Sequence, residues 1–169
     1  STQSFLMAAA TLDNRGGKII SRDSLQVRIA RALDNSAEGI VSAQNGLQVQ
    51  ADSLNNQAGG ALASRGTLEL NVTGLLDNRN QGVVTAASTL TTTSGSVNNS
   101  DKGRFSAGTQ QVLTTGALDN HQGGHIVSDA SLTVTATDVD NRNGVIGSQQ
   151  ALNLTTADLD NSTGLINSQ

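Results

Sequence analysis

The chain has 169 residues and a net charge of −4, and its composition excludes several classes of protein before any motif is considered. It contains no cysteine, so disulfide bonds and thiolate metal sites are excluded. No run of apolar residues is long enough to span a bilayer as a helix. The negative charge and the near absence of aromatic residues argue against nucleic acid as a partner.

The composition favours a folded β protein with an aliphatic core. Hydrophobic residues make up 36% of the chain, but there are only two Phe and one Met, and no Trp or Tyr. A core must therefore be built from Leu, Ile, Val and Ala. Proline is absent, and because proline cannot donate to a hydrogen-bond ladder, its absence favours a backbone that is paired along most of its length.

A three-residue phrase, Leu-Asp-Asn or a close variant, returns along the whole chain. Its copies begin at positions 12, 33, 54, 76, 97, 118, 139 and 159, so that successive copies lie 20 to 22 residues apart. A Gly follows each copy, and in most units it is followed by an apolar pair and then by a stretch in which apolar and polar residues alternate. Alternation with period two predicts a β-strand, and self-similarity at a fixed period predicts a repeat architecture.

The predicted strands can be followed in chain order. Apolar pairs or alternating stretches predict strands at 19–20, 25–29, 40–41, 47–49, 68–72, 83–84, 132–134, 145–146 and 152–154. The fifth unit departs from this pattern, because Arg104 and Phe105 replace the usual aliphatic pair. In the same unit Val112 and Leu113 predict that the second strand is shifted.

Two strands of about five residues cannot bury an apolar face alone, but stacked units form parallel sheets that share one core. The fold class predicted is therefore all-β, a parallel β-solenoid that occupies residues 1–169 as a single repeat array. Phe5 and Met7 occupy the places that Leu132 and Val134 hold in a later unit, so the first unit is expected to be cut inside a coil. We expect the chain to be a fragment of a longer rod.

The third residue of the phrase is always Asn, and it is expected at a bend. There its amide can bond the backbone and tolerate left-handed angles, and stacked amides can bond each other along the axis. The predicted ladder consists of Asn14, Asn35, Asn56, Asn78, Asn99, Asn120, Asn141 and Asn161. The Asp that precedes Asn in six copies is expected to face solvent, because stacked carboxylates about 4.8 Å apart would repel each other if buried. Weak cation binding by this row is the alternative.

The sequence LDN-x-x-G-x-I-x-S followed by L-x-V-x-A resembles the repeats of the filamentous haemagglutinin family. Members are large exoproteins that Gram-negative bacteria export by two-partner secretion, and related arrays occur in effectors of contact-dependent growth inhibition. The resemblance implies a right-handed β-helix of about 21-residue coils at the bacterial cell surface. It further implies an outer-membrane transporter as export partner and a shaft that carries an adhesin or toxin-delivery region.

The sequence predicts no catalytic residue, no cofactor and no metal. Paired carboxylates could indicate a carbohydrate-active enzyme, but a column of Asp produces such spacings automatically. His121 and His125 would hold a metal only with further donors from neighbouring coils, and they are expected to be exposed turn residues.

Basic residues cluster near the start of the chain and offer candidate surface-binding positions for an anionic glycan or lipid headgroup. The candidates are Arg15, Lys18, Arg22, Arg28 and Arg31, together with Arg104 in the irregular fifth unit. Three functions therefore remain open, which are a passive shaft, an adhesin segment that itself binds a host or bacterial receptor or glycan, and a carbohydrate-active enzyme.

Overall fold

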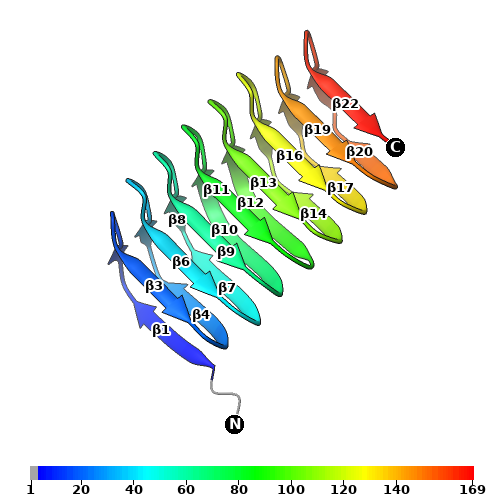
Figure 1. Ribbon diagram of the computed structural model, residues 1–169. Helices are drawn as coiled ribbons and strands as arrows, with labels where there is room; N and C mark the ends of the chain where they lie inside the picture. The colour runs from blue at the N-terminus through cyan, green and yellow to red at the C-terminus, as the bar shows by residue number, and fades with distance from the viewer. Residues whose placement is uncertain (1–3) are drawn as a thin grey trace.

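The computed structural model describes residues 4–169, which form a stack of parallel β-strands with no helix in that range (Figure 1). The strands belong to one 14-stranded and one 8-stranded sheet. In Figure 1 the coils follow one another in chain order, from β1 at one end of the stack to β22 at the other. Since the described residues contain no helix, none of them forms a helix long and apolar enough to cross a membrane.

Each coil contributes one strand to the 8-stranded sheet and one or two to the 14-stranded sheet. The smaller sheet contains β3 (Lys18–Ser21), β6 (Ile40–Ala43), β9 (Ala61–Ser64), β11 (Val83–Ala86), β13 (Arg104–Ala107), β16 (His125–Ser128), β19 (Val145–Ser148) and β22 (Leu165–Ser168). The main path of the larger sheet contains β1 (Phe5–Ala9), β4 (Ser24–Ile29), β7 (Gly46–Ala51), β10 (Thr67–Asp77), β12 (Leu90–Asn98), β14 (Gln110–Thr114), β17 (Ser131–Thr135) and β20 (Leu152–Thr155). Short corner strands complete it: β2 (Leu12–Asp13), β5 (Ala32–Asp34), β8 (Ser53–Asn55), β15 (Ala117–Asp119), β18 (Asp138–Asp140) and β21 (Asp158–Asp160).

The predicted repeat is the repeat of the structure. Leu12 pairs with Leu33, and the same residue of the phrase remains in register along the stack as far as Leu159. The longest coil, of 22 residues, keeps this register because an irregularity between Val72 and Leu75 absorbs the extra residue. The prediction of an all-β solenoid with coils of about 21 residues is confirmed.

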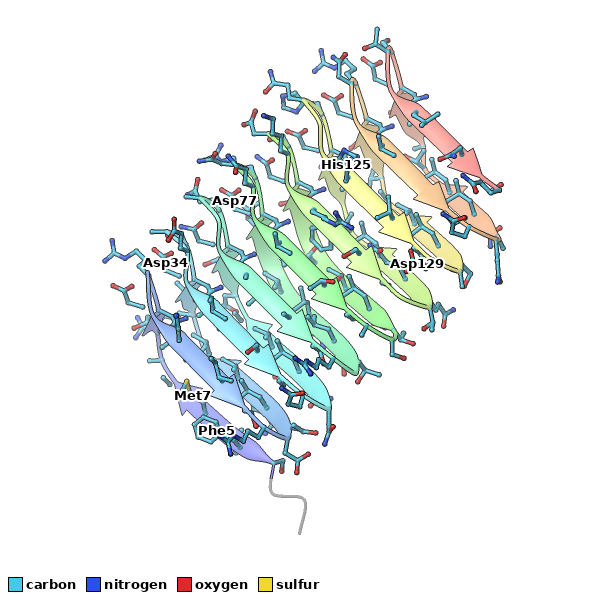
Figure 2. The ribbon with its side chains drawn as sticks, viewed as in Figure 1. Phe5, Met7, Asp34, Asp77, His125 and Asp129 are labelled. Carbon is cyan, nitrogen blue, oxygen red and sulfur yellow. The ribbon has the colours of Figure 1, made fainter. Side chains whose placement is uncertain are left out.

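The core consists of apolar columns that run along the axis of the stack. One column contains Leu47, Leu68 and Leu90 at equivalent positions of β7, β10 and β12, and all three are buried. As predicted, Phe5 pairs with Leu25 and Met7 with Val27, so the first strand follows the same alternation (Figure 2). Because every inward side chain rests on its counterpart one coil away, the core is continuous from coil to coil.

The predicted irregularity of the fifth unit is only partly present. Phe105 stays in the apolar column between Val84 and Ile126 and is completely buried. The prediction that the second strand shifts is wrong, because Leu113 of β14 pairs in register with Val134 of β17. In this register Gln111 lies in the column between Leu90 and Leu132.

Gln111 shares the core with a second polar side chain, that of Thr92 in the preceding coil. Thr92 and Gln111 are each only 1% exposed. Three buried side-chain atoms in the described part of the chain lack a hydrogen-bond partner, namely Thr92 Oγ1 and both polar atoms of Gln111. Such atoms lose their hydration without compensation, so this part of the core is expected to be destabilising.

Left-handed backbone angles occur in every coil, but not at the position that the sequence indicated. The expectation placed them at the ladder Asn, whereas the structure has them two or three residues later, as at Ala58 (φ 52°) and Gln122 (φ 53°). Thr163 also adopts φ 59°, which is unusual for a β-branched residue. The left-handed angles lie there because the chain reverses its direction in the turn between the Asn and the next Gly, and not at the Asn itself.

Candidate functional site

The most regular feature of the molecule is a buried column of asparagine amides at the corner of the coils. In seven successive bonds of 2.7–2.8 Å, the Nδ2 of one Asn donates to the Oδ1 of the Asn in the next coil. The column contains Asn14, Asn35, Asn56, Asn78, Asn99, Asn120, Asn141 and Asn161. The six inner members are completely buried, so these bonds form away from competing water.

All of these amides except that of Asn99 also close the turn that follows them, by donating to the carbonyl of the next Gly. The Nδ2 of Asn78 donates to the carbonyl of Gly82 at 3.0 Å and to that of Arg104, one coil further on, at 3.2 Å. A Cβ on Gly82 would lie 2.5 Å from the Oδ1 of Asn78. Gly is therefore required here because the Asn side chain approaches the backbone closely, and not because of a left-handed angle.

The residue before each ladder Asn makes a turn contact that the sequence analysis missed. Its side-chain oxygen accepts the backbone N–H of the residue two positions later, as in Asp34, which accepts from Ser36 at 3.0 Å. The contact is present in all eight copies, at Asp13, Asp34, Asn55, Asp77, Asn98, Asp119, Asp140 and Asp160. The sequence does contain a signal for this contact. Positions 55 and 98 carry Asn where the other copies carry Asp, and the side chains of Asp and Asn both provide an Oδ1 acceptor.

The expectation that all six Asp of this row face solvent is wrong for Asp77, which is only 9% exposed. Its neighbours in the adjacent coils are Asn55 and Asn98 rather than carboxylates. The repulsion that would prevent burial is therefore missing, and Arg79 lies 3.3 Å from the carboxylate. Figure 2 shows Asp34 and Asp77 along the same edge of the stack, with Asp129 at the opposite edge.

Two arginines compensate the carboxylates that do stack on one another. Arg15 donates to both oxygens of Asp13 at 2.9 and 2.7 Å and lies 3.8 Å from Asp34. Its side-chain hydrogen bond is the main cause that lowers the pKa of Asp13 from 3.8 to about 2. Arg142 makes the same bidentate contact with Asp140 and lowers the pKa of that carboxyl group.

Asp119 stacks on Asp140, and the residue that contacts Asp119 is a histidine instead of an arginine. The Nδ1 of His121 contacts the Oδ1 of Asp119, and Asp140 of the next coil joins them. One donor atom from each of these three residues lies within 4.8 Å of the others. The neighbouring coil therefore does offer a further donor, and His121 is half-buried rather than exposed as expected. His125 lies outside the group and is exposed, but it belongs to strand β16 and not to a turn (Figure 2).

The six basic candidates are exposed but do not form one patch. Lys18 projects from β3 of the smaller sheet, whereas Arg28 projects from β4 of the larger one. Arg22 and Arg31 lie in the segments beyond these strands, and Arg15 is engaged by its acidic neighbours. The last candidate, Arg104, lies four coils away on β13, so the structure does not bring it together with the others.

A groove of about 600 Å³ lies across the larger sheet at β4, β7, β10 and β12. Its polar lining includes a hydrogen-bonded row in which Gln26 donates to Gln48 at 2.7 Å and Gln48 donates to Glu69 at 2.9 Å. This row presents amide and carboxylate groups that could pair with polar groups of a ligand.

The fold and the corner geometry define a parallel β-solenoid of stacked 21-residue repeats. The Haemagglutinin repeat family matches over residues 6–37, 20–90, 63–122 and 105–169, and the chain belongs to this family. Family membership indicates a segment of a secreted, filamentous, adhesin-like protein. Comparisons with curated proteins and with solved structures gave no significant match.

Proposed function

We propose that this chain is a structural shaft segment of a large secreted bacterial surface exoprotein, and that it projects a distal functional region away from the cell. The observation that carries this proposal is the asparagine ladder, which continues without interruption through every coil. A ladder of this kind fixes the register of each coil on the next. The stack can therefore grow in length without any change in its cross-section.

The mechanical role follows from the spacing of the strands. Each coil uses about 21 residues to advance the rod by roughly 4.8 Å, so eight coils span about 40 Å. Apolar and amide columns along the axis make nearest-neighbour contacts that resist bending of one coil on another. Length, rather than chemistry at one position, is the property that such a repeat provides, and the shaft is proposed to be non-enzymatic.

The setting proposed for this shaft comes from its family. Exposure at the bacterial surface and export through an outer-membrane transporter by two-partner secretion both accord with membership of the haemagglutinin repeats. The distal region would be an adhesin or a toxin that the filament delivers. The right-handed winding implied by the resemblance to this family belongs to the same proposal.

The groove on the larger sheet favours a second candidate function, in which the segment itself binds a receptor or glycan. Its row of Gln26, Gln48 and Glu69 offers donors and acceptors at successive coils. Arg28, on the same strand as Gln26, adds a positive charge beside this row. An adhesin of this kind would bind through a few outward residues, whereas a shaft would not depend on them.

Cell binding separates the two functions. The labelled protein is titrated onto epithelial and bacterial cells, alongside a variant in which Gln48 and Arg28 are both replaced by Ala. The shaft proposal predicts no saturable binding by either protein. Saturable binding that the double variant loses would contradict the shaft and support the adhesin.

Deletion of whole coils tests the shaft directly. Removal of residues 99–140 joins Asn98 to Asn141 and restores the phrase in register. We expect this protein to fold cooperatively with a long dimension shorter by about 10 Å, measured by small-angle X-ray scattering. A matched deletion of residues 99–129 breaks the register and should unfold. Equal stability of the two deletions would contradict the proposal.

A further inference from the structure

One corner of the stack differs chemically from all the others. At the position directly after the ladder Asn, the other coils carry Arg15, Ser36, Gln57, Arg79, Ser100, Arg142 and Ser162. Only the coil of Asn120 places an imidazole there, that of His121. We propose that Asp119, His121 and Asp140 form a binding site for a divalent transition-metal ion such as Zn²⁺, which joins this coil to the next.

The fold brings the three donors together without any long-range rearrangement. Asp119 and Asp140 are paired residues of β15 and β18, so their carboxylates project from adjacent strands. The turn holds His121 beside them, because its backbone N–H donates to the Oδ1 of Asp119 at 3.1 Å. The metal site thus uses a corner that the coils already share.

The distances suit a metal of small radius. One donor atom of each residue lies within 4.8 Å of the other two. Zn²⁺ binds nitrogen and oxygen at about 2.0–2.2 Å, so the ligands of one ion are roughly 3–4 Å apart. Rotation of partly exposed side chains closes the remaining gap, since the side chains of the three residues are 26–37% exposed.

The identity of the donors selects the class of metal. An imidazole nitrogen with two carboxylates is a mixed set that suits Zn²⁺ and its neighbours, whereas Ca²⁺ takes six to eight oxygen ligands. Three protein ligands leave a fourth position for water. The site is therefore expected to discriminate between Zn²⁺ and Ca²⁺ through His121.

Arg142 is the group that opposes metal binding. It donates to Asp140 at 2.9 and 2.6 Å, so its positive charge competes with an ion for this carboxylate. Arg142 also lies 3.6 Å from Asp160, which provides a second partner when Asp140 turns towards a metal. Removal of the guanidinium should consequently tighten metal binding.

Calorimetric titration with ZnCl₂ at neutral pH tests this site on the whole chain. We expect one equivalent of Zn²⁺ to bind the wild-type protein, with Ca²⁺ unable to compete. His121→Gln should weaken Zn²⁺ binding by about tenfold or more, since the outer-shell partners of a ligand alone are worth roughly 10–100-fold. His125→Gln, which removes the exposed histidine outside the group, is the matched control and should bind as the wild type does.

Arg142→Gln should change the affinity for Zn²⁺ in the opposite direction. It should bind Zn²⁺ more tightly than the wild type, and a gain of affinity cannot arise from misfolding. The proposal is overturned if the wild-type chain takes up no stoichiometric Zn²⁺, if the two His variants lose affinity equally, or if Arg142→Gln weakens binding while circular dichroism shows a folded chain.

Discussion

Asn99 and Gln111 belong to the same part of the stack, carry the same carboxamide group and are both at most 1% exposed, yet their environments are opposite. The Nδ2 of Asn99 donates to Asn120 at 2.7 Å, and its Oδ1 accepts from Asn78 at 2.8 Å. Neither polar atom of Gln111 has a partner.

The difference between these two amides lies in the neighbouring coils. Asn99 has an identical residue above and below it, so each amide supplies the donor or acceptor that the next one needs. Gln111 has Leu90 and Leu132 at the same position of adjacent strands, and these can offer it nothing. A parallel stack therefore accepts a buried polar residue when the residue repeats, and loses stability when it occurs once.

The largest effect is expected where the repeated column is broken. Asn78→Ala removes the bonds to Asn56 and Asn99 and leaves buried groups unsatisfied in both adjacent coils. At about 1–3 kcal/mol for each of two such groups, the free energy of unfolding should fall by roughly 2–6 kcal/mol. Urea denaturation measures this change.

Asn80→Gly is the control for that experiment. Asn80 lies in the same turn but is exposed and has φ 53°, an angle that glycine adopts without strain. Its replacement should leave the midpoint nearly unchanged. If both variants unfolded at the same urea concentration, the ladder would have no special part in stability.

An apolar column should be nearly as sensitive. Leu90→Ala opens a cavity in the middle of the stack, at a completely buried position, and should lower the free energy of unfolding by roughly 2–5 kcal/mol. Arg22→Ala changes an exposed side chain and should alter it by no more than about 0.5 kcal/mol. Equal denaturation midpoints for the two variants would contradict the assigned register.

Removal of an unrepeated polar group should act in the other direction. Thr92→Val replaces the hydroxyl without a partner by a methyl group of similar size, so we expect a stabilisation of about 1 kcal/mol. Thr93→Val makes the same exchange at the next residue, which is exposed, and should bring no comparable gain. Thermal unfolding followed by circular dichroism distinguishes the two variants, and a loss of stability in Thr92→Val would contradict a destabilising effect of the unpaired hydroxyl group.

The smallest effect concerns the exposed ion pair at the first corner. The pKa of Asp13 is lowered to about 2 in the folded chain, so its contribution to stability is fully present above its ordinary pKa of 3.8. That contribution is lost as the pH falls through about 2. Arg15→Gln should move the pKa of Asp13 back towards 3.8, as measured by NMR titration, and an unchanged pKa would exclude Arg15 as the cause.

The sequence was sufficient to predict the columns, because the position of each residue in the phrase fixes its place around the coil. Asn99 is aligned with Asn78 and Asn120 by spacing alone, and the structure joins these three amides. Spacing does not state how an irregular unit is accommodated. The second strand of the fifth unit could shift or keep its register, and only the packing shows that it kept the register and buried Gln111.

The features that the sequence analysis missed depend on neighbours in adjacent coils. Asp77 was expected to be exposed because it was considered with the other Asp, whereas its burial depends on having Asn55 and Asn98 as neighbours. The proximity of His121 to Asp140 likewise crosses from one coil to the next. A comparison of each position with its counterpart about 21 residues away would have found both.

The most direct test replaces the repeated amide of Asn99 and the isolated amide of Gln111 by leucine, one at a time. Asn99→Leu and Gln111→Leu each replace a buried carboxamide by an apolar side chain, and urea denaturation of the two variants gives their midpoints. We expect the midpoint to fall for Asn99→Leu and to rise for Gln111→Leu. A shift in the same direction for both variants would contradict the claim that repetition along the stack decides whether a buried polar side chain stabilises this fold.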